Sequence, residues 1–211
     1  MLEPAVTMFP RLETLMLEAT YGAKENIMPH RQETDEELMK VIKETTERGG
    51  KVLIPTLGVG RAQEVMLAIE QMVREGKMEK IPVYIDGMVW DVTAIHTAYP
   101  EYLNNTIRKL IFHKDQNPFL HEIFTRVGSQ KERMDIIENT GPCVILATSG
   151  MLTGGPSVEY LKHLCSNPKN ALGFVNYQGE GSMGRRIQKG EKEFTFSDGG
   201  KEILLKLIPT H

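Results

Sequence analysis

The residues best suited to hold an anion lie in a loop of small side chains at positions 147–156. The loop follows an apolar run at 143–146 and precedes a helical pattern at 157–164, so the sequence predicts a junction from a buried strand to a helix. Backbone N–H groups at such a helix N-terminus can bind a phosphate. The candidate phosphate-binding positions in this loop are Ser149, Gly150 and Gly154. The alternative is a tight turn that binds nothing, since short strand-to-helix loops are common.

A second loop combines two glycines with an arginine. Gly58, Gly60 and Arg61 follow an apolar run at 51–55 and open another helical pattern. An arginine in the first turn opposes the helix dipole unless an anion or a carboxylate lies beside it, and this conflict favours phosphate binding. The loop matches neither the Walker A pattern nor the GxGxxG fingerprint, so it does not identify a known nucleotide site.

A third loop carries Gly181, Arg185 and Arg186, and its arginines fall in the first turn of a short predicted helix. We predict that these three residues also contact phosphate. The alternative is a basic surface turn in which the arginines pair with Glu180 or Glu191.

Two carboxylates follow short apolar runs. We predict that the run at 15–17 is a strand and that Glu18 projects from its end, the alternative being an ordinary surface glutamate. Asp86 follows the run at 82–85 and is predicted to add a second carboxylate, close to the only tryptophan, Trp90. Because parallel strands of an open sheet end at one edge, we expect all these loops to line a single cleft for a phosphate-rich ligand.

The elements that must position these loops alternate along the chain. Short apolar runs predict strands at 51–55, 82–85, 143–147 and 171–175, with amphipathic helices between them. Ser129 and Glu132 have the spacing of a capping box and predict a helix start. Strands joined by helices of this length predict an α/β fold, a mainly parallel sheet flanked by helices in a Rossmann-like arrangement.

Composition is that of an ordinary soluble globular protein, with 40% apolar residues, 25% charged residues and a net charge of −3. Binding of nucleic acid would therefore need a local basic patch. Cys143 and Cys165 lie in or beside apolar segments, which indicates reduced cysteines and a cytoplasmic protein. No apolar run is long enough to predict a membrane span. The six histidines are scattered without ligand spacing, so no metal site and no cofactor are predicted in this chain.

The order and spacing of the loops resemble one family. The chain resembles the β-CASP region of ribonucleases of the metallo-β-lactamase superfamily, and it is most similar to archaeal homologues of the cleavage and polyadenylation specificity factor nuclease. The resemblance rests on residues 2–7, 9–14, 18–22, 49–55, 58–64, 86–88, 94–100, 147–160 and 177–188. It covers nearly the whole chain and implies a single β-CASP domain at 1–211.

The resemblance also implies roles for these residues. Glu18 matches the family's acidic motif A, which implies a carboxylate that holds a catalytic-site histidine further along the chain. The glycine and arginine loops are implied to line an RNA cleft, so RNA is the expected partner, with a homodimer as a further implied assembly. The family hydrolyses phosphodiester bonds with two zinc ions and a bridging hydroxide.

One departure from the family pattern is decisive for the expected activity. The HxHxDH zinc motif of the family does not occur in this chain, and His211 lacks the Gly-His context of the motif B histidine. We therefore expect an RNA-binding cap domain, a fragment that is inactive alone. The two zinc ions are expected in the full-length protein, where the metallo-β-lactamase domain would be the partner of this one.

An alternative function belongs to another class of protein. A stand-alone Rossmann-like module that binds a nucleotide or a phosphorylated small molecule would also explain the glycine loops. The absence of GxGxxG and of an acidic partner for a ribose argues against this alternative.

Overall fold

The structure is a computed structural model that describes residues 1–3, 7–198 and 201–206. Its centre is a sheet of five parallel strands in the order β3-β2-β4-β1-β5. The two continuous apolar runs form its inner strands β1 (Lys51–Pro55) and β4 (Cys143–Ala147), in which every residue is buried. Such uninterrupted runs are typical of parallel strands that are covered on both faces.

The remaining strands of this sheet are shorter. They are β2 (Val83–Asp86), β3 (Phe124–Val127) and β5 (Ala171–Leu172). The α/β prediction with a mainly parallel sheet is confirmed. Strand β3 lies in a stretch without a clear sequence pattern and was not predicted, and the strand expected at 171–175 ends after two residues.

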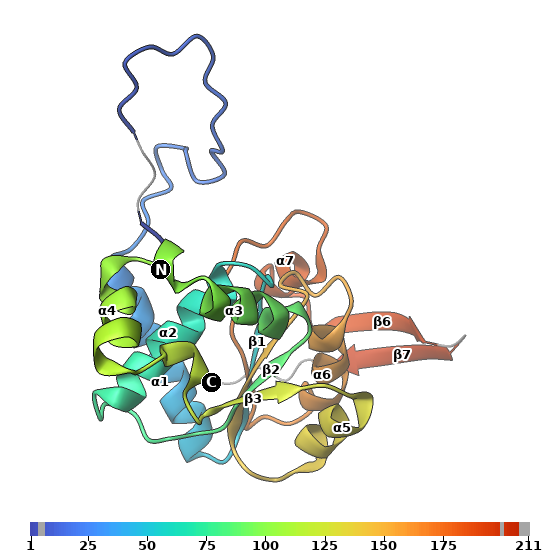
Figure 1. Cartoon of the computed structure of the whole chain (residues 1–211). Coiled ribbons are helices and arrows are strands. Elements are labelled where there is room, and N and C mark those ends of the chain that lie inside the picture. The colour runs from blue at the N-terminus through green and yellow to red at the C-terminus, as the bar shows by residue number, and fades with distance from the viewer. Residues whose placement is uncertain (4–6, 199–200, 207–211) are drawn as a thin grey trace.

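Helices cover both faces of the sheet (Figure 1). One face packs against α1 (Arg31–Glu47), α2 (Arg61–Arg74), α3 (Met88–Ala98) and α4 (Asn105–Lys114). The other face packs against α5 (Gln130–Glu138) and α6 (Pro156–Leu164), with α7 (Met183–Gln188) beside them. Two short 3-10 turns complete the helical elements described: η1 (Pro100–Tyr102) and η2 (Pro118–Leu120).

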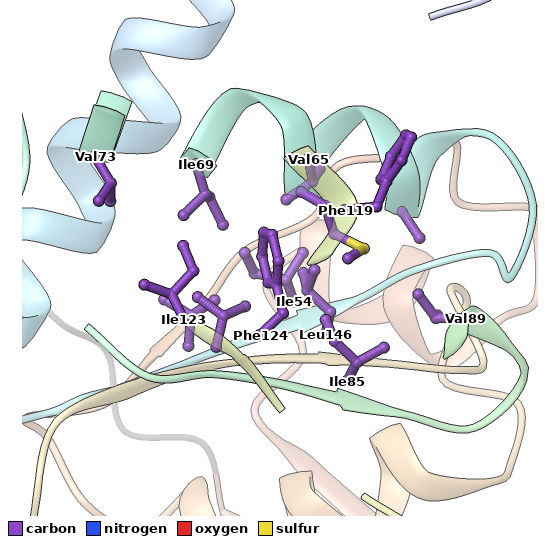
Figure 2. Close-up of a cluster of buried hydrophobic side chains, with 14 of the residues drawn as sticks. Ile54, Val65, Ile69, Val73, Ile85, Val89, Phe119, Ile123, Phe124 and Leu146 are labelled. Atoms are coloured by element: carbon purple, nitrogen blue, oxygen red, sulfur yellow. The ribbon is translucent and has the colours of Figure 1, made fainter. Parts of the chain in front are cut away.

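Alternation along β4 separates the two cores. Val144 and Leu146 point into the larger cluster, where α2 residues such as Val65 and Ile69 meet the sheet (Figure 2). Cys143, Ile145 and Ala147 point into the smaller cluster with α6. This period of two places the same strand in both cores and holds the end of β4 firmly between the helical layers.

Helix ends follow local rules. Ser129 Oγ accepts a hydrogen bond from Glu132 N at 3.2 Å and caps α5 as predicted, while the Glu132 carboxylate accepts from Gly128 N and not from Ser129 N. At the other end of α5, the buried ammonium of Lys51 donates to the carbonyls of Ile136 and Ile137 at 2.7 and 2.8 Å. This contact ties the C-terminus of α5 to the start of β1, because those carbonyls have no partner within the helix.

The strand predicted at 15–17 is wrong. Residues 7–29 contain no helix or strand and project away from the sheet (Figure 1), and Met16 is 93% exposed. A strand needs a neighbour that takes its backbone hydrogen bonds, and no strand in the described ranges pairs with this run. An antiparallel hairpin, β6 (Glu193–Asp198) and β7 (Lys201–Lys206), was also not predicted.

Candidate functional site

Four of the loops expected to line a cleft do meet, at the edge of the sheet where the parallel strands end. We call this the carboxyl edge: residues 56–61 after β1, 86–88 after β2, 148–156 after β4 and 173–186 after β5. Contacts between the loops are made by glycines. A Cβ on Gly58 would lie 3.2 Å from Met88 Cβ, and one on Gly87 would lie 2.2 Å from Thr148 Oγ1. Glycines at these positions therefore let the loops approach each other.

Gly150 is the most tightly enclosed of the predicted site glycines. A Cβ at this position would lie 2.8 Å from Leu57 N and 2.9 Å from both Thr56 C and Asn176 Nδ2. Its carbonyl accepts hydrogen bonds from Asn176 Nδ2 at 3.1 Å and Gln178 Nε2 at 2.8 Å. Gly150 therefore joins the loops after β1, β4 and β5, which is a packing role that the sequence did not predict.

Replacing Gly150 with alanine is expected to destabilise the fold by about 1–3 kcal/mol, because the new methyl group meets backbone atoms that cannot move alone. Urea unfolding of the variant and the parent chain measures the change. The matched control is Gly128→Ala, whose Cβ would meet only the flexible Glu132 carboxylate at 3.8 and 3.9 Å. Equal losses in the two variants would contradict the enclosed position of Gly150.

The backbone N–H groups at the start of α6 are not free for an anion, and this part of the sequence prediction is wrong. Ser157 N donates to Thr148 O at 2.8 Å and Val158 N donates to Gly155 O at 3.2 Å, while Pro156 has no N–H to give. Ser149 Oγ accepts from Thr153 N at 2.9 Å, and Gly154 O accepts from Ser149 N at 3.3 Å. These four N–H groups therefore have acceptors within the same loop, and positive charge at the carboxyl edge comes from side chains.

The predicted arginines supply that charge, and each pairs with a nearby carboxylate. Arg61 donates to Glu64 at 2.8 Å on the first turn of α2, which resolves the conflict with the helix dipole without a phosphate. Arg185 lies 3.7 Å from Glu180. Both are ion pairs of at least partly exposed side chains.

Arg186 is the most fixed of the three arginines. It pairs with Glu191, with Nε donating to Oε2 at 2.7 Å, and its guanidinium lies 4.9 Å from the centre of the Phe194 ring. The Glu191 carboxylate raises the pKa of Arg186. Arg186 therefore adopts the paired surface arrangement that was the alternative interpretation of this loop.

Gly60 and Gly181 have positive φ angles of 81° and 80°, and no atom lies within 4 Å of the Cβ that either would carry. Gly60 is the N-cap of α2, and its N–H donates to Gln63 Oε1 at 2.7 Å. Backbone geometry, which glycine adopts freely, accounts for both positions.

Asp86 does not face a cleft, contrary to expectation. Its carboxylate is buried and accepts from Arg133 Nε at 2.8 Å, Arg133 Nη2 at 3.0 Å and Tyr160 Oη at 3.0 Å. The hydrogen-bonded carboxylate raises the pKa of Arg133, and burial raises the pKa of Tyr160. Sequence reasoning missed Arg133 and Tyr160 as the partners of Asp86, because they come from α5 and α6. Trp90 packs partly buried against the larger core.

Glu18 lies in the exposed N-terminal segment and not at the end of a strand. Its carboxylate accepts from the hydroxyl of Thr20 and, at 2.7 Å, from Thr20 N. These hydrogen bonds hold the pKa of the Glu18 carboxyl below its usual value, so it is ionised at neutral pH. The segment approaches the carboxyl edge at Tyr21, whose ring centre lies 6.1 Å from that of Tyr177 in an edge-to-face contact.

The residues that the structure describes do not form a zinc site. Across the described ranges, no three His, Cys, Asp or Glu side chains lie where they could hold a metal ion together. Two hollows on the surface are lined by none of the predicted site residues. One, of about 320 Å³, lies beside β5 and is lined by Leu161, Leu172 and Ile187 among others. No helix in the described part of the chain combines the length and apolar character needed to cross a membrane.

Comparison with known proteins shows which family and which proteins this chain is similar to. A family model described as "Beta-Casp domain" matches residues 62–187, more than half of the 211 residues. The chain is 61% identical over 193 residues to "Transcription termination factor FttA" of Methanocaldococcus jannaschii, covering 92% of this chain and 30% of that protein. It is 52% identical over 211 residues to the protein of the same name from Thermococcus kodakarensis, covering 99% and 32%.

These relatives are longer proteins, since the chain spans about a third of their length. The predicted resemblance is confirmed, because the matched region extends from α2 to α7 and contains two of the predicted site loops, at 148–156 and 179–186. The chain belongs to the Beta-Casp domain family.

Proposed function

We propose that this chain is the RNA-binding cap of a zinc-dependent RNA-processing nuclease. Membership of the Beta-Casp family and the likeness to proteins named transcription termination factors support a role on RNA. The observation that carries the proposal is the convergence of Arg61 and Arg185 on the carboxyl edge, on loops that glycine contacts hold together.

The ion pairs of these arginines are compatible with RNA binding. Exposed salt bridges contribute about 0–1 kcal/mol, whereas hydrogen bonds from arginine to phosphate are charge-assisted and often bidentate. A phosphate can therefore displace Glu64 from Arg61 or Glu180 from Arg185 at little cost. The contacts made by Ser149, Gly150 and Gly154 would then position the loop and not bind the phosphate themselves.

The catalytic part of the nuclease would lie outside the residues described. In this proposal Glu18 contributes an ionised carboxylate to a histidine of the metallo-β-lactamase domain, and that domain holds the two zinc ions. The isolated chain is expected to bind RNA without cleaving it. A cytoplasmic location and a homodimer belong to the same proposal.

The test is RNA binding by arginine variants. Arg61→Ala and Arg185→Ala are each expected to weaken binding of labelled single-stranded RNA by about 1–3 kcal/mol and to reduce the salt dependence by about one phosphate contact. Fluorescence anisotropy at several salt concentrations measures both. Lys43→Ala on α1, which removes an exposed cation paired with Glu47, is the matched control and is expected to change neither.

Unchanged affinity in both arginine variants would overturn the assignment of the carboxyl edge to RNA. The stand-alone nucleotide module predicts a different result, namely a saturable rise in melting temperature with a mononucleotide and none with RNA. Both ligands can be compared on one sample by thermal unfolding.

A further inference from the structure

Tyr177 is an exposed aromatic side chain on a loop that is otherwise locked in place. The residue is 49% exposed, and it lies between Asn176 and Gln178, the two residues whose amide groups bind Gly150 O. Tyr177 opens the stretch 177–188 that contributes to the family resemblance, but no role was predicted for it, and the ion pairs described above do not involve it. An exposed ring on a fixed backbone is suited to binding, because little conformational entropy is lost when a ligand packs on it.

The hydrogen bonds of the neighbours define how Tyr177 is held. In addition to their bonds to Gly150 O, the two amide groups make a second hydrogen bond each. Asn176 Nδ2 donates to Tyr177 O at 3.2 Å, and Gln178 Nε2 donates to Asn176 O at 3.1 Å. Gln178 is only 2% exposed. Every one of these bonds is donated by an amide nitrogen to a carbonyl, so flipping either amide would place oxygen against oxygen. The orientation of the loop at Tyr177 is thereby fixed.

Close packing of Gly184 against Gln178 also restricts this loop. A Cβ on Gly184 would lie 1.8 Å from Gln178 Oε1, and Gly184 N donates to Met151 O at 3.3 Å. Among the described residues, Asn176 Oδ1 and Gln178 Oε1 are buried without a hydrogen-bond donor. A buried acceptor without a donor is unfavourable, so the surrounding contacts must impose this conformation.

The ring and a cation belong to the same small unit. Arg185 N donates to Ser182 Oγ at 3.2 Å at the start of α7, next to Gly184. Gly179 adjoins the Tyr177 ring, since its Cβ would lie 4.0 Å from Cε1 of Tyr177. The segment 176–185 therefore carries a half-exposed ring and a partly exposed guanidinium on a backbone that these hydrogen bonds hold in place.

We propose that Tyr177 is a stacking platform for a nucleobase of single-stranded RNA, with Arg185 binding a neighbouring phosphate. This inference rests on the proposed function and names the residue that would contact a base. Stacking of bases on aromatic side chains combined with cations along the backbone is a general mode of binding single strands, because every base has a flat face. The contact is tolerant of sequence for the same reason.

Binding of two labelled strands of equal length to the 211-residue chain tests the proposal: one RNA with all its bases, and one ribose-phosphate strand without bases. Tyr177→Ala is expected to bind the complete RNA about 5- to 150-fold more weakly, with an unchanged salt dependence. Tyr177→Phe keeps the ring and is expected to bind like the parent chain. Tyr102→Ala removes an exposed tyrosine on η1 and is the matched control.

The strand without bases gives a readout that needs no variant, which matters if Tyr177→Ala does not fold. The parent chain is expected to bind it more weakly than the complete RNA, and Tyr177→Ala is expected to show a smaller difference between the two strands. Equal affinity of the parent chain for both strands overturns the stacking inference. If Tyr177→Ala binds like the parent while Arg185→Ala binds weakly, stacking is excluded and RNA binding stands. If the parent chain binds no RNA, the proposed function and this inference both fall.

Discussion

Replacing Arg133 with methionine is expected to destabilise the fold by about 3–5 kcal/mol, the largest effect we predict for a single side chain. Arg133 donates two hydrogen bonds to Asp86, whose side chain is only 3% exposed. Without the guanidinium, the carboxylate would remain in the protein interior with Tyr160 Oη as its remaining hydrogen-bond partner of those described. Urea unfolding at neutral pH measures the loss.

Two further variants separate the buried pair from arginine replacement in general. Arg126→Met removes a guanidinium that lies 3.8 Å from Asp91 with both side chains exposed, and it is expected to cost less than about 1 kcal/mol. The double variant Asp86→Asn with Arg133→Met should be more stable than the sum of its single changes predicts, because it leaves no uncompensated charge. A loss below about 1 kcal/mol in Arg133→Met would contradict the importance of the pair.

The parts of the fold that depend on local pattern were predictable. The runs at 52–55 and 143–147 are apolar without interruption, and both lie in strands whose residues are all buried. Ser129 and Glu132 cap α5 as their spacing predicts. In these two cases residues that are close in sequence are sufficient for the prediction. A continuous apolar run is typical of a strand buried on both faces, and a helix cap is formed by residues three positions apart.

The parts that depend on distant partners were not predictable. The run at 15–17 has the composition of a strand, but pairing is decided by a neighbouring strand. Asp86 lies at the carboxyl end of β2, where a carboxylate could face a cleft. Its charge is instead neutralised by Arg133, which lies 47 positions further along the chain. Such contacts arise only when α5 packs on the sheet, and no local pattern contains them.

The candidate site combines both situations. Parallel topology brings the loops after β1, β4 and β5 to one edge, and this was expected because parallel strands of an open sheet end at the same edge. The role of the glycines differs from expectation, since Gly150 meets protein backbone and the N–H groups at the start of α6 are already satisfied. The glycine-rich composition therefore indicated close approach correctly, but the approaching group is another loop of the same chain.

Ionisation of the Cys143 thiol is expected to lower the stability of the fold between pH 9 and pH 11, and this is the second of the two largest effects we predict. Burial raises the pKa of this thiol from 9.0 to about 11, and the nearby Lys51 opposes the rise. Because the folded-state pKa lies above the unfolded value, the protonated thiol makes its full contribution to the free energy of unfolding below pH 9. This contribution is lost as the pH rises through 11. Two pKa units correspond to a loss of about 3 kcal/mol across this range.

The thiol is isolated by comparing the parent chain with Cys143→Ala at pH 8 and pH 11. Burial also raises the pKa values of Tyr84 and Tyr160, so the parent chain loses stability at high pH for other reasons as well. Those losses occur in both chains, and only the difference between them is assigned to Cys143. We expect the alanine variant to be less stable at pH 8, because it loses buried volume, but to lose about 3 kcal/mol less on going to pH 11. An equally steep fall in Cys143→Ala would show that the thiol has the same pKa in the folded and unfolded states.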